Sequence, residues 1–265
     1  MASTSVDFSK KCIVFVTGAS RGIGRTIAVE LSRRLQQNSI FVLIARSEKG
    51  LEETKNLIQE VDKALNVQTI ALDLSKPNLV EYTNIFNKVL SSIDKDDIYS
   101  ALFFHNAGSI GEAKQTTDLI DLQKWSDYYH FNLFSVALLN STFIKLLRPV
   151  APQLVVVNIT SLAGRQPFVN LSMYGSGKAA RELFFKALAI EEPNVIVFNY
   201  SPGPVDTDMF TTIIEEAQSE EVRNNFKKTK ETSILTTSQT VNKMLEILEK
   251  GDFKSGDTID YYDRI

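Results

Sequence analysis

The sequence predicts an α/β fold in which a doubly wound parallel sheet is covered by helices on both faces. Short apolar runs alternate with stretches of helical periodicity along most of the 265 residues. A glycine-rich turn follows the first apolar run and opens the first helical stretch, which is typical of Rossmann-type sheets that bind dinucleotides. Strand–helix alternation favours parallel strands joined by right-handed crossovers. We therefore expect a single Rossmann-type domain over residues 1–265, with a flexible N-terminus at residues 1–10.

The expected strands are short apolar runs of the kind that is buried on both faces of a sheet. They cover residues 13–16, 40–45, 67–72, 99–104, 154–160 and 195–200. The expected helices carry apolar residues at three- and four-residue steps. They cover residues 23–36, 48–65, 79–93, 122–130, 133–147 and 174–190. Residues 205–233 are polar and helical, so they form either a mobile substrate lid or an ordinary pair of surface helices.

Composition excludes several classes of function. The 29 basic and 32 acidic residues nearly balance, and no basic block attracts nucleic acid. No apolar run approaches the roughly 18 residues that span a bilayer, and the polar N-terminal residues do not form a secretory signal. Cys12 is the only cysteine and there are two histidines, so neither an intrachain disulfide nor a metal site is expected. We expect a cytoplasmic protein that binds no nucleic acid, membrane or metal.

Tyr174 and Lys178 stand four residues apart in the helix expected after residue 173, so they share one face. An ammonium there is expected to lower the phenol pKa from its ordinary value of about 10 and to prepare the tyrosine for proton transfer. Ser161 follows the preceding apolar run, where a strand end can turn its hydroxyl toward the phenol. Tyrosine and lysine at this spacing are also common in ordinary helices. The strand-end serine and the glycine turn favour chemistry.

The glycine turn predicts a dinucleotide site, because glycines let a pyrophosphate approach the N-terminus of a helix. The turn consists of Gly18, Ala19, Ser20, Arg21, Gly22, Ile23 and Gly24. The second strand ends at Ala45-Arg46, whereas NAD-selective sites place an acid there. Arg46 and Arg21 can hold a 2′-phosphate, so NADP is the expected cofactor, although Arg46 is alternatively a solvent-facing arginine.

Two more strand ends provide candidates for the cofactor site. Asp73, followed by Leu74, ends the third strand and either accepts from an adenine edge or caps a turn. Asn106 follows the fourth strand, at the carboxyl edge of the sheet where ligands bind. The loop around Asn106 is alternatively structural.

Together these motifs resemble the short-chain dehydrogenase/reductase family over nearly the whole chain. The matching residues are Thr17 to Gly24, Asn106-Ala107-Gly108, Asn132, Ser161, Tyr174, Lys178 and Pro202-Gly203. His105 departs from the family pattern, which has asparagine at that position. The resemblance implies that Ser161, Tyr174 and Lys178 are catalytic, that Lys178 also binds the nicotinamide ribose, and that Asn132 holds a water or the lysine in a proton relay.

The resemblance also implies a homodimer, in which residues 133–147 and 174–190 pack against their symmetry mates. It further implies that one segment after the sixth strand wraps the nicotinamide end of the cofactor. That segment consists of Val205, Asp206, Thr207, Asp208, Met209 and Phe210.

The C-terminal tail is similar to that of pterin-reducing members of the family. The resemblance implies that Asp260, in the run Asp260-Tyr-Tyr-Asp263, holds the amino-pyrimidinone edge of a pterin by two parallel hydrogen bonds. Gly203 would let the backbone approach the substrate. Without the resemblance, Asp260 is better explained as a solvated end of a C-terminal strand.

We therefore expect NADPH-dependent reduction of a pterin side-chain ketone. Tyr174 would donate the proton, and Ser161 would bind the carbonyl oxygen where negative charge develops. One alternative is a broad NADPH-dependent reductase of small diketones and other carbonyls. Another is a non-catalytic regulator that binds NADP on the same fold.

Overall fold

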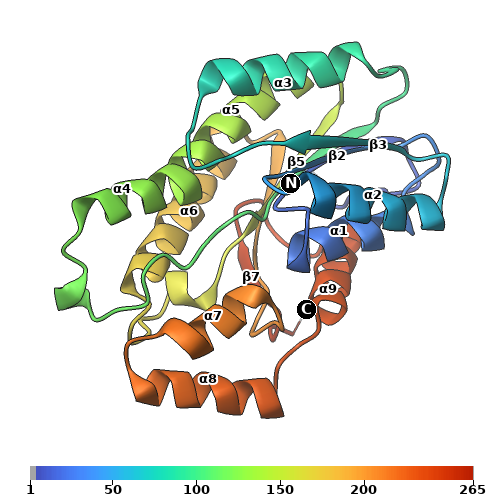
Figure 1. Cartoon of the computed structure of the whole chain (residues 1–265). Helices are drawn as coiled ribbons and strands as arrows, with labels where there is room; N and C mark the ends of the chain where they lie inside the picture. The colour runs from blue at the N-terminus through green and yellow to red at the C-terminus, as the bar shows by residue number, and fades with distance from the viewer. Residues whose placement is uncertain (1–3, 265) are drawn as a thin grey trace.

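Seven parallel strands form one sheet in the order β3-β2-β1-β4-β5-β6-β7 (Figure 1). The computed structural model describes residues 4–264. Its strands are β1 (Cys12–Thr17), β2 (Ile40–Ala45), β3 (Asn66–Ala71), β4 (Ser100–His105), β5 (Gln153–Ile159), β6 (Val195–Ser201) and β7 (Thr258–Asp260). The winding direction reverses at β1, which pairs with β2 on one side and β4 on the other. This arrangement confirms the predicted doubly wound Rossmann-type sheet.

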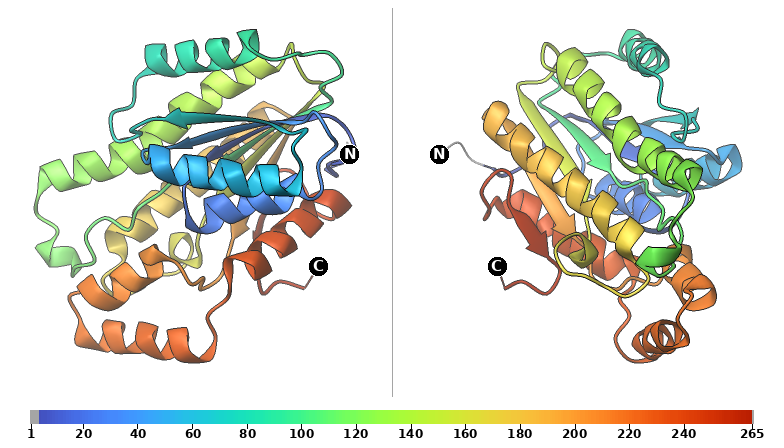
Figure 2. Two further views of the ribbon diagram at one scale, coloured as in Figure 1. Left: turned by 45° about the vertical axis from the view of Figure 1, so that its right-hand side comes forward. Right: turned by 90° about the vertical axis from the view of Figure 1, so that its left-hand side faces the viewer.

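Helices cover both faces of the sheet (Figure 2). One face carries α1 (Gly22–Ser32), α2 (Glu48–Val61) and α9 (Thr237–Lys250), and the other carries α3 (Leu79–Ser91), α5 (Ser135–Leu147) and α6 (Ser172–Glu191). Strand β1 shows why both faces are apolar. Val14 and Val16 pack into the first core, whereas Ile13 and Phe15 pack into the second, because successive side chains of a strand point to opposite faces.

The expected elements are present within a few residues of their predicted bounds, but α9 was not predicted, and β7 was anticipated only as the alternative explanation of Asp260. Helix α9 carries two local signals. A capping box joins Thr236 and Gln239 at its start, and Gly251 in the left-handed region (φ 71°) ends it. β7 is only three residues long, too short for its periodicity to identify it from sequence.

Helices α4 (Leu122–Tyr129) and α5 are joined by a π-helical turn, His130–Phe134, rather than by a loop. The wider turn contains Asn132, which is 2% exposed. Turns of this kind are frequent at functional sites. Asn132, a predicted site residue, therefore lies in the π-helical turn and not in a regular α-helix.

Residues 4–10, the described part of the N-terminus that we expect to be flexible, pack against the body of the protein. Val6 is 2% exposed and Phe8 is 3% exposed. The Val6 amide donates to the Leu248 carbonyl at 2.8 Å, and Thr4 Oγ1 donates to the carbonyls of Gly251 and Phe253. Residues 1–3 lie outside the described residues.

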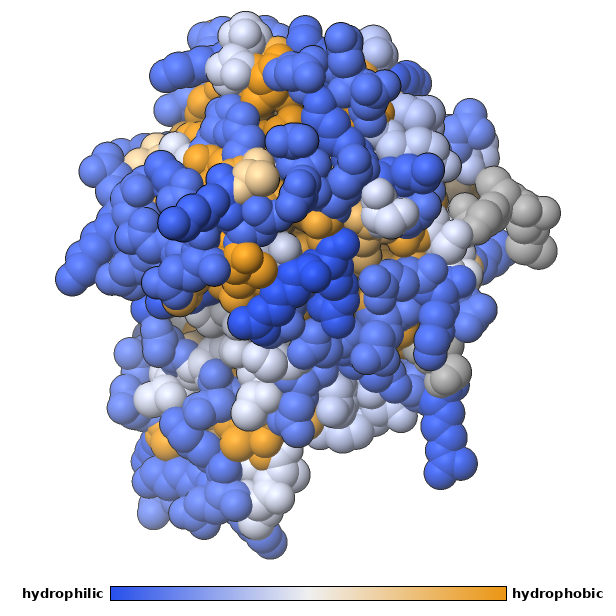
Figure 3. Space-filling view, turned by 90° about the vertical axis from the view of Figure 1, so that its right-hand side faces the viewer, coloured by the Kyte–Doolittle hydropathy of each residue, from blue (hydrophilic) through white to orange (hydrophobic). Residues whose placement is uncertain are grey.

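Residues 205–233 form α7 (Asp208–Glu216) and α8 (Glu220–Thr232), inserted between β6 and α9. The two helices project beyond the carboxyl end of the sheet (Figure 1). The right-hand side of the molecule in Figure 1 is mostly hydrophilic, with apolar residues scattered among polar ones (Figure 3). Within residues 4–264, none of the helices combines the length and apolar character needed to cross a membrane.

Candidate active site

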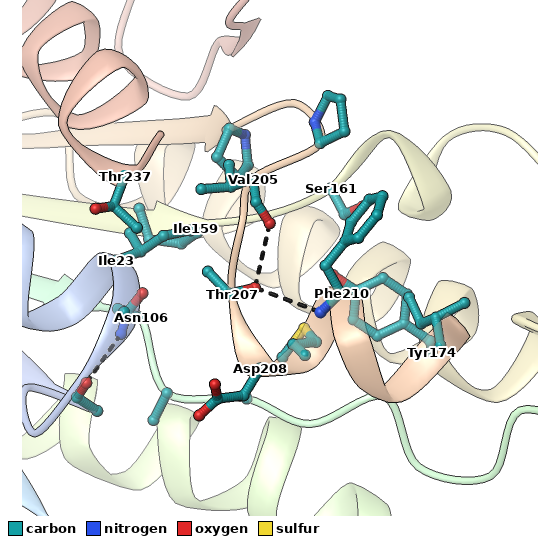
Figure 4. Close-up of a pocket in the computed structure, with 18 of the residues that line it drawn as sticks. Ile23, Asn106, Ile159, Ser161, Tyr174, Val205, Thr207, Asp208, Phe210 and Thr237 are labelled. Atoms are coloured by element: carbon teal, nitrogen blue, oxygen red, sulfur yellow. Dashed lines mark hydrogen bonds between the residues drawn. The ribbon is translucent and has the colours of Figure 1, made fainter. Parts of the chain in front are cut away.

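A cavity of about 1800 Å³ opens at the carboxyl ends of the strands, between the glycine turn, α6 and the α7–α8 pair. Most of the predicted site residues line it: Gly18, Ser20, Arg21, Gly22, Ile23, Ala45, Arg46, Leu74, Asn106, Ser161, Tyr174, Lys178, Gly203, Val205, Asp206, Thr207, Asp208, Met209, Phe210 and Asp260. In the described chain, Ala19, Gly24, Asp73 and Asn132 are not among its walls. Figure 4 shows Ser161, Tyr174 and Phe210 toward one side of the cavity and Ile23 and Asn106 toward the other.

The glycine turn fits the pyrophosphate of a dinucleotide. Gly18 and Gly22 have positive φ angles of 68° and 54°, and a Cβ on Gly24 would lie only 2.2 Å from the Gly18 carbonyl oxygen. Helix α1 begins at Gly22, its N-cap Arg21 makes no side-chain cap bond, and its first turn contains no acidic residue. The N–H groups of that turn remain available to an anion.

At the end of β2, where NAD-selective sites place an acid, the cavity is lined by a cation. Arg46 follows β2, is exposed and lines the cavity. Arg21 NH1 pairs with Asp208 Oδ2 of α7 at 2.5 Å, with both side chains exposed. Asp73 Oδ1 accepts from the Ser75 amide at 3.0 Å, and this bond is the main cause of its lowered pKa. Asp73 therefore caps a turn in this structure, which is the second of its two predicted roles.

Ser161 and Tyr174 meet at the carboxyl end of β5. Ser161 begins the short helical turn η3 (Leu162–Gly164), and its Oγ accepts from the Ala163 amide at 3.2 Å. Tyr174 lies in the first turn of α6. Burial raises the pKa of the Tyr174 phenol, while a hydrogen bond with Ser161 and the charge of Arg181 act to lower it. The net direction is upward, so the phenol is protonated at neutral pH.

Lys178 is 5% exposed, and its Nζ donates to the Ile159 carbonyl oxygen at 2.6 Å. That nitrogen lies 5.7 Å from the centre of the Tyr174 ring. Burial, reinforced by the charge of Arg181, lowers the pKa of Lys178 well below its ordinary value. The predicted lowering of the Tyr174 pKa by Lys178 is therefore not found, because a buried amine favours its neutral form.

Arg181 is a charged residue near the site to which the sequence analysis gave no role. It is fully buried on α6, three residues after Lys178. Its guanidinium donates to the carbonyls of His105 and Ala107 and to Asn158 Oδ1. The spacing is a usable signal, because residues three and seven positions apart lie on one helix face.

Asn132 is held by three hydrogen bonds that do not involve Lys178 or Tyr174. Its Oδ1 accepts from the Ser109 amide at 2.9 Å, and its Nδ2 donates to Ser109 Oγ and to the Tyr128 carbonyl. A Cβ on Gly108 would lie 3.3 Å from Asn132 Oδ1 and 3.8 Å from Lys178 Nζ, so the two side chains are near neighbours. Its part in a proton relay stays a prediction.

Asp260 provides the polar end of the cavity. It reaches the site because β7 pairs with β6, which places it beside Ser201. Asp260 Oδ2 accepts from Ser201 Oγ at 2.5 Å and from Arg165 at 3.4 Å, and Oδ1 accepts from the Tyr262 amide at 3.1 Å. The carboxylate is thus already bonded, and Arg165 and Ser201 are partners that the sequence analysis did not identify.

The cavity walls opposite the glycine turn are largely apolar. They consist of Leu162, Pro167, Phe168, Val169, Leu171, Met209, Phe210, Ile213, Val222 and Phe226. The Phe210 and Phe226 rings lie 5.1 Å apart and join α7 to α8. Several of these residues come from loops, where no periodicity distinguishes a wall residue from any other.

The segment from Val205 to Phe210 lines the cavity and contains the N-cap of α7, Thr207. Thr207 Oγ1 donates to the Val205 carbonyl at 3.3 Å and accepts from the Phe210 amide at 3.4 Å (Figure 4). Asp206 pairs with Lys230 of α8 at 3.4 Å. The segment is therefore well ordered by local bonds, and its movement as a lid stays a prediction.

Comparisons with known proteins show the family to which the chain is similar. The profile of the short chain dehydrogenase family matches residues 12–218. A sepiapterin reductase of Xenopus tropicalis is 37% identical over 267 residues, which cover 99% of this chain and 100% of the relative. A benzil reductase ((S)-benzoin forming) of Bacillus cereus is 30% identical over 252 residues, which cover 93% of this chain and 97% of the relative.

The fold also matches solved structures. A short chain dehydrogenase of Shigella flexneri complexed with NADP superposes with a TM-score of 0.77 at 23% identity, covering 97% of this chain and 99% of that one. This likeness concerns the fold. The family profile and the relatives confirm the resemblance that the motifs indicated. The chain belongs to the short-chain dehydrogenase/reductase family and is an oxidoreductase.

Proposed function

We propose that this oxidoreductase uses NADPH to reduce a side-chain ketone of a pterin. The observation that carries the proposal is one cavity lined by Ser161, Tyr174 and Lys178, by the glycine turn, and by Asp260. The similarity to sepiapterin reductases supports the substrate class. The cation Arg46 after β2, where an acid would favour NAD, supports NADPH.

The side chains of this cavity suit carbonyl reduction. An NADPH whose pyrophosphate is held at the glycine turn would supply the hydride from its reduced nicotinamide. Tyr174 donates a proton to the carbonyl oxygen, for which its raised pKa is appropriate because the phenol is protonated at neutral pH. The Ser161 hydroxyl donates to the same oxygen as negative charge develops. Lys178 is the candidate for the nicotinamide ribose, and Asn132 for the route that returns a proton.

Asp260 would orient the substrate. Its carboxylate can accept two parallel N–H donors from an amino-pyrimidinone edge, a charge-assisted arrangement that favours pterins over simple ketones. Because Ser201 and Arg165 already donate to Oδ2, a pterin would share that oxygen or displace Arg165. Gly203, with φ 73°, keeps the backbone close to the cavity at this end.

A second candidate is a general NADPH-dependent reductase of diketones and other carbonyls. The apolar walls formed by Phe168, Val169 and Phe226 favour it, since they can receive an aromatic ketone without a polar anchor. The similarity to benzil reductase supports this alternative. A third hypothesis is a regulator that binds NADP without catalysis, and only the fold supports it.

Steady-state turnover of sepiapterin and of benzil, each with NADPH and with NADH, tests the proposal. We expect sepiapterin with NADPH to give the highest kcat/KM. A higher kcat/KM for benzil would favour the general reductase, and no NADPH oxidation with any carbonyl would favour the regulator. The Tyr174→Phe variant is the control for chemistry. It should bind NADPH normally and lose turnover by about 10²–10⁴-fold, and full activity would remove the proton-transfer role.

We further propose a cytoplasmic homodimer. Leu183 and Ile190 on α6 are 70% and 82% exposed, and Phe134 before α5 is also exposed. Helices α5 and α6 run side by side over one face of the sheet (Figure 2), so these apolar residues suit burial against a second copy. The cytoplasmic assignment rests on the unpaired, buried Cys12, which suits a reducing compartment.

A further inference from the structure

Glu182 is a buried acid of α6 to which the proposed chemistry gives no role. It is 4% exposed, and it is not among the cavity walls in the described chain. It stands four residues after Lys178 and eight after Tyr174, so it continues the helix face that carries both. A buried carboxylate is costly for folding unless it is paired and hydrogen-bonded. Its partners therefore indicate which elements of the fold it joins.

The hydrogen bonds of Glu182 lead to two strands at the active site. Its Oε1 accepts from Thr258 Oγ1 of β7 at 2.8 Å and from Lys186 Nζ at 2.7 Å. Its Oε2 accepts from Thr160 Oγ1, just after β5, at 3.1 Å. Oε2 also lies 3.9 Å from Arg165 Nε. One side chain of α6 is therefore bonded both to the carboxyl end of β5 and to β7.

Thr258 and Asp260 share one face of β7. They are two residues apart, so their side chains point to the same side of the sheet. Ile259, which lies between them, packs into the first core on the opposite side. The bond from Thr258 to Glu182 therefore holds β7 two residues before the carboxylate that lines the cavity.

The sheet supports β7 less than it supports β5. β7 is three residues long and lies at the edge, where β6 is its only neighbouring strand within residues 4–264. β5 pairs with strands on both sides, and the Thr160 amide after it donates to the Tyr200 carbonyl at 2.8 Å. A side-chain bond from Glu182 therefore contributes more to the position of Asp260 than to that of Ser161.

We propose that Glu182 is a positioning residue that holds the Asp260 carboxylate at a set distance from the Tyr174 hydroxyl and so determines which ketones are reduced. The inference rests on the proposed function, in which Asp260 anchors the substrate and Tyr174 protonates its carbonyl. A substrate anchored at one end presents its ketone correctly only if the span between these two groups matches the molecule. An anchored ketone therefore needs Glu182, whereas a ketone held by the apolar walls alone does not.

Removing the donor of the Thr258–Glu182 bond tests the proposal in the intact protein. Thr258→Val keeps a β-branched side chain in the strand and leaves Glu182 bonded to Lys186 and Thr160. We expect kcat/KM for sepiapterin to fall by about five- to twentyfold and kcat/KM for benzil to stay within about twofold of wild type. Lys186→Met removes a 43% exposed partner of the same carboxylate and, as the matched control, should change neither value. An equal loss for both substrates, or no loss for sepiapterin, would overturn the proposal.

A double-mutant cycle shows whether Thr258 acts through Asp260. In the Asp260→Asn background, Thr258→Val should change kcat/KM for sepiapterin by no more than about twofold, because the anchor that it positions is already lost. The same loss in both backgrounds would indicate a general structural effect and contradict positioning. Glu182→Met removes the acceptor instead of the donor and should reproduce the loss seen in Thr258→Val. Should Glu182→Met fail to fold, the cycle with Thr258→Val still decides.

Amide hydrogen exchange separates a failure of this proposal from a failure of the proposed function. The Tyr261 amide, just after β7, donates to the Ser201 carbonyl at 2.9 Å. Its exchange should be about tenfold faster in Thr258→Val than in wild type and unchanged in Lys186→Met. Unchanged exchange in Thr258→Val would overturn the proposal whatever the substrate. If sepiapterin is not reduced, the proposed function fails, and the exchange rate still decides whether Glu182 holds β7.

Discussion

Arg165 and Asp260 meet at the polar end of the cavity, where Arg165 NH2 lies 3.4 Å from Asp260 Oδ2. Arg165 is partly exposed and also lies 3.9 Å from Glu182 Oε2. A substrate that uses the Asp260 carboxylate must therefore compete with a neighbouring cation. A ketone that uses only the apolar walls does not meet this competition.

The Arg165–Asp260 pair predicts opposite effects of two substitutions on substrate choice. Arg165→Gln should lower the KM for sepiapterin by about two- to fivefold, because the substrate no longer competes with Arg165 for the carboxylate. This factor corresponds to the free energy of a partly exposed ion pair. Asp260→Asn should raise that KM by about tenfold or more, since a charge-assisted anchor is lost. The KM for benzil should be unchanged in both variants. Arg148→Gln, which breaks a surface pair with Glu192, is the control. Equal changes for the two substrates would contradict an anchoring role.

Arg46 should decide cofactor choice. Arg46→Ala removes the cation after β2, and we expect the KM for NADPH to rise by about 10- to 100-fold because a charged hydrogen bond to the 2′-phosphate is lost. The KM for NADH should change little. Arg33→Ala, which removes an arginine paired with Glu30 on α1, is the matched control. If NADPH and NADH respond alike, Arg46 does not bind the phosphate.

His105 should make stability depend on pH below neutrality. Burial holds the pKa of the folded-state imidazole well below 6.5, so only the unfolded chain takes up a proton as pH falls through 6.5. The free energy of unfolding should then decrease with falling pH, by at most about 1.4 kcal/mol per unit from this group.

His105→Asn should flatten that decrease, as measured by urea unfolding at several pH values between neutrality and mild acid. The buried Nδ1 of His105 has no hydrogen-bond partner in the described structure, so the asparagine does not break a bond to that nitrogen. An identical slope in His105→Asn and wild type would refute the assignment.

The homodimer proposal predicts that a charge on α6 separates the subunits. Leu183→Glu puts a carboxylate at a 70% exposed apolar position, where burial against a second copy would leave it unpaired. Sedimentation at micromolar concentration should show a dimer for wild type and a monomer for the variant. Val80→Glu on α3, at a 69% exposed position, should stay dimeric. A monomeric wild type would remove the proposal.

The fold, and the placement of Tyr174 and Lys178 on one helix beside the glycine turn, were predictable because their signals are local. The β1 strand, the glycine turn and the start of α1 follow one another within a few residues, and Tyr174 and Lys178 are one helical turn apart. What could not be predicted depends on distant contacts. Arg165 and Ser201 become partners of Asp260 only through the pairing of β7 with β6. The protonation of Tyr174 and Lys178 depends on burial, which four-residue spacing alone does not reveal.

The packing of the N-terminal segment also depends on contacts that are distant in the sequence. Residues 4–10 are mostly polar, so composition predicts flexibility, yet Val6 and Phe8 are buried against the first core. Their partners include Leu248 of α9, at the far end of the sequence. A pattern short of one full helical turn or strand carries too little signal to predict such docking.

The bridge between Val205 and Leu235 closes the base of the α7–α8 excursion. The Leu235 amide donates to the Pro204 carbonyl at 2.8 Å, and the Asp206 amide donates to the Leu235 carbonyl at 2.9 Å. These two backbone hydrogen bonds join the beginning and the end of the α7–α8 segment. A loop whose two ends are joined in this way can vary in length and content at little entropic cost to its scaffold. Relatives could diversify their substrate range by exchanging this one insert, while Tyr174 and Lys178 on α6 stay untouched.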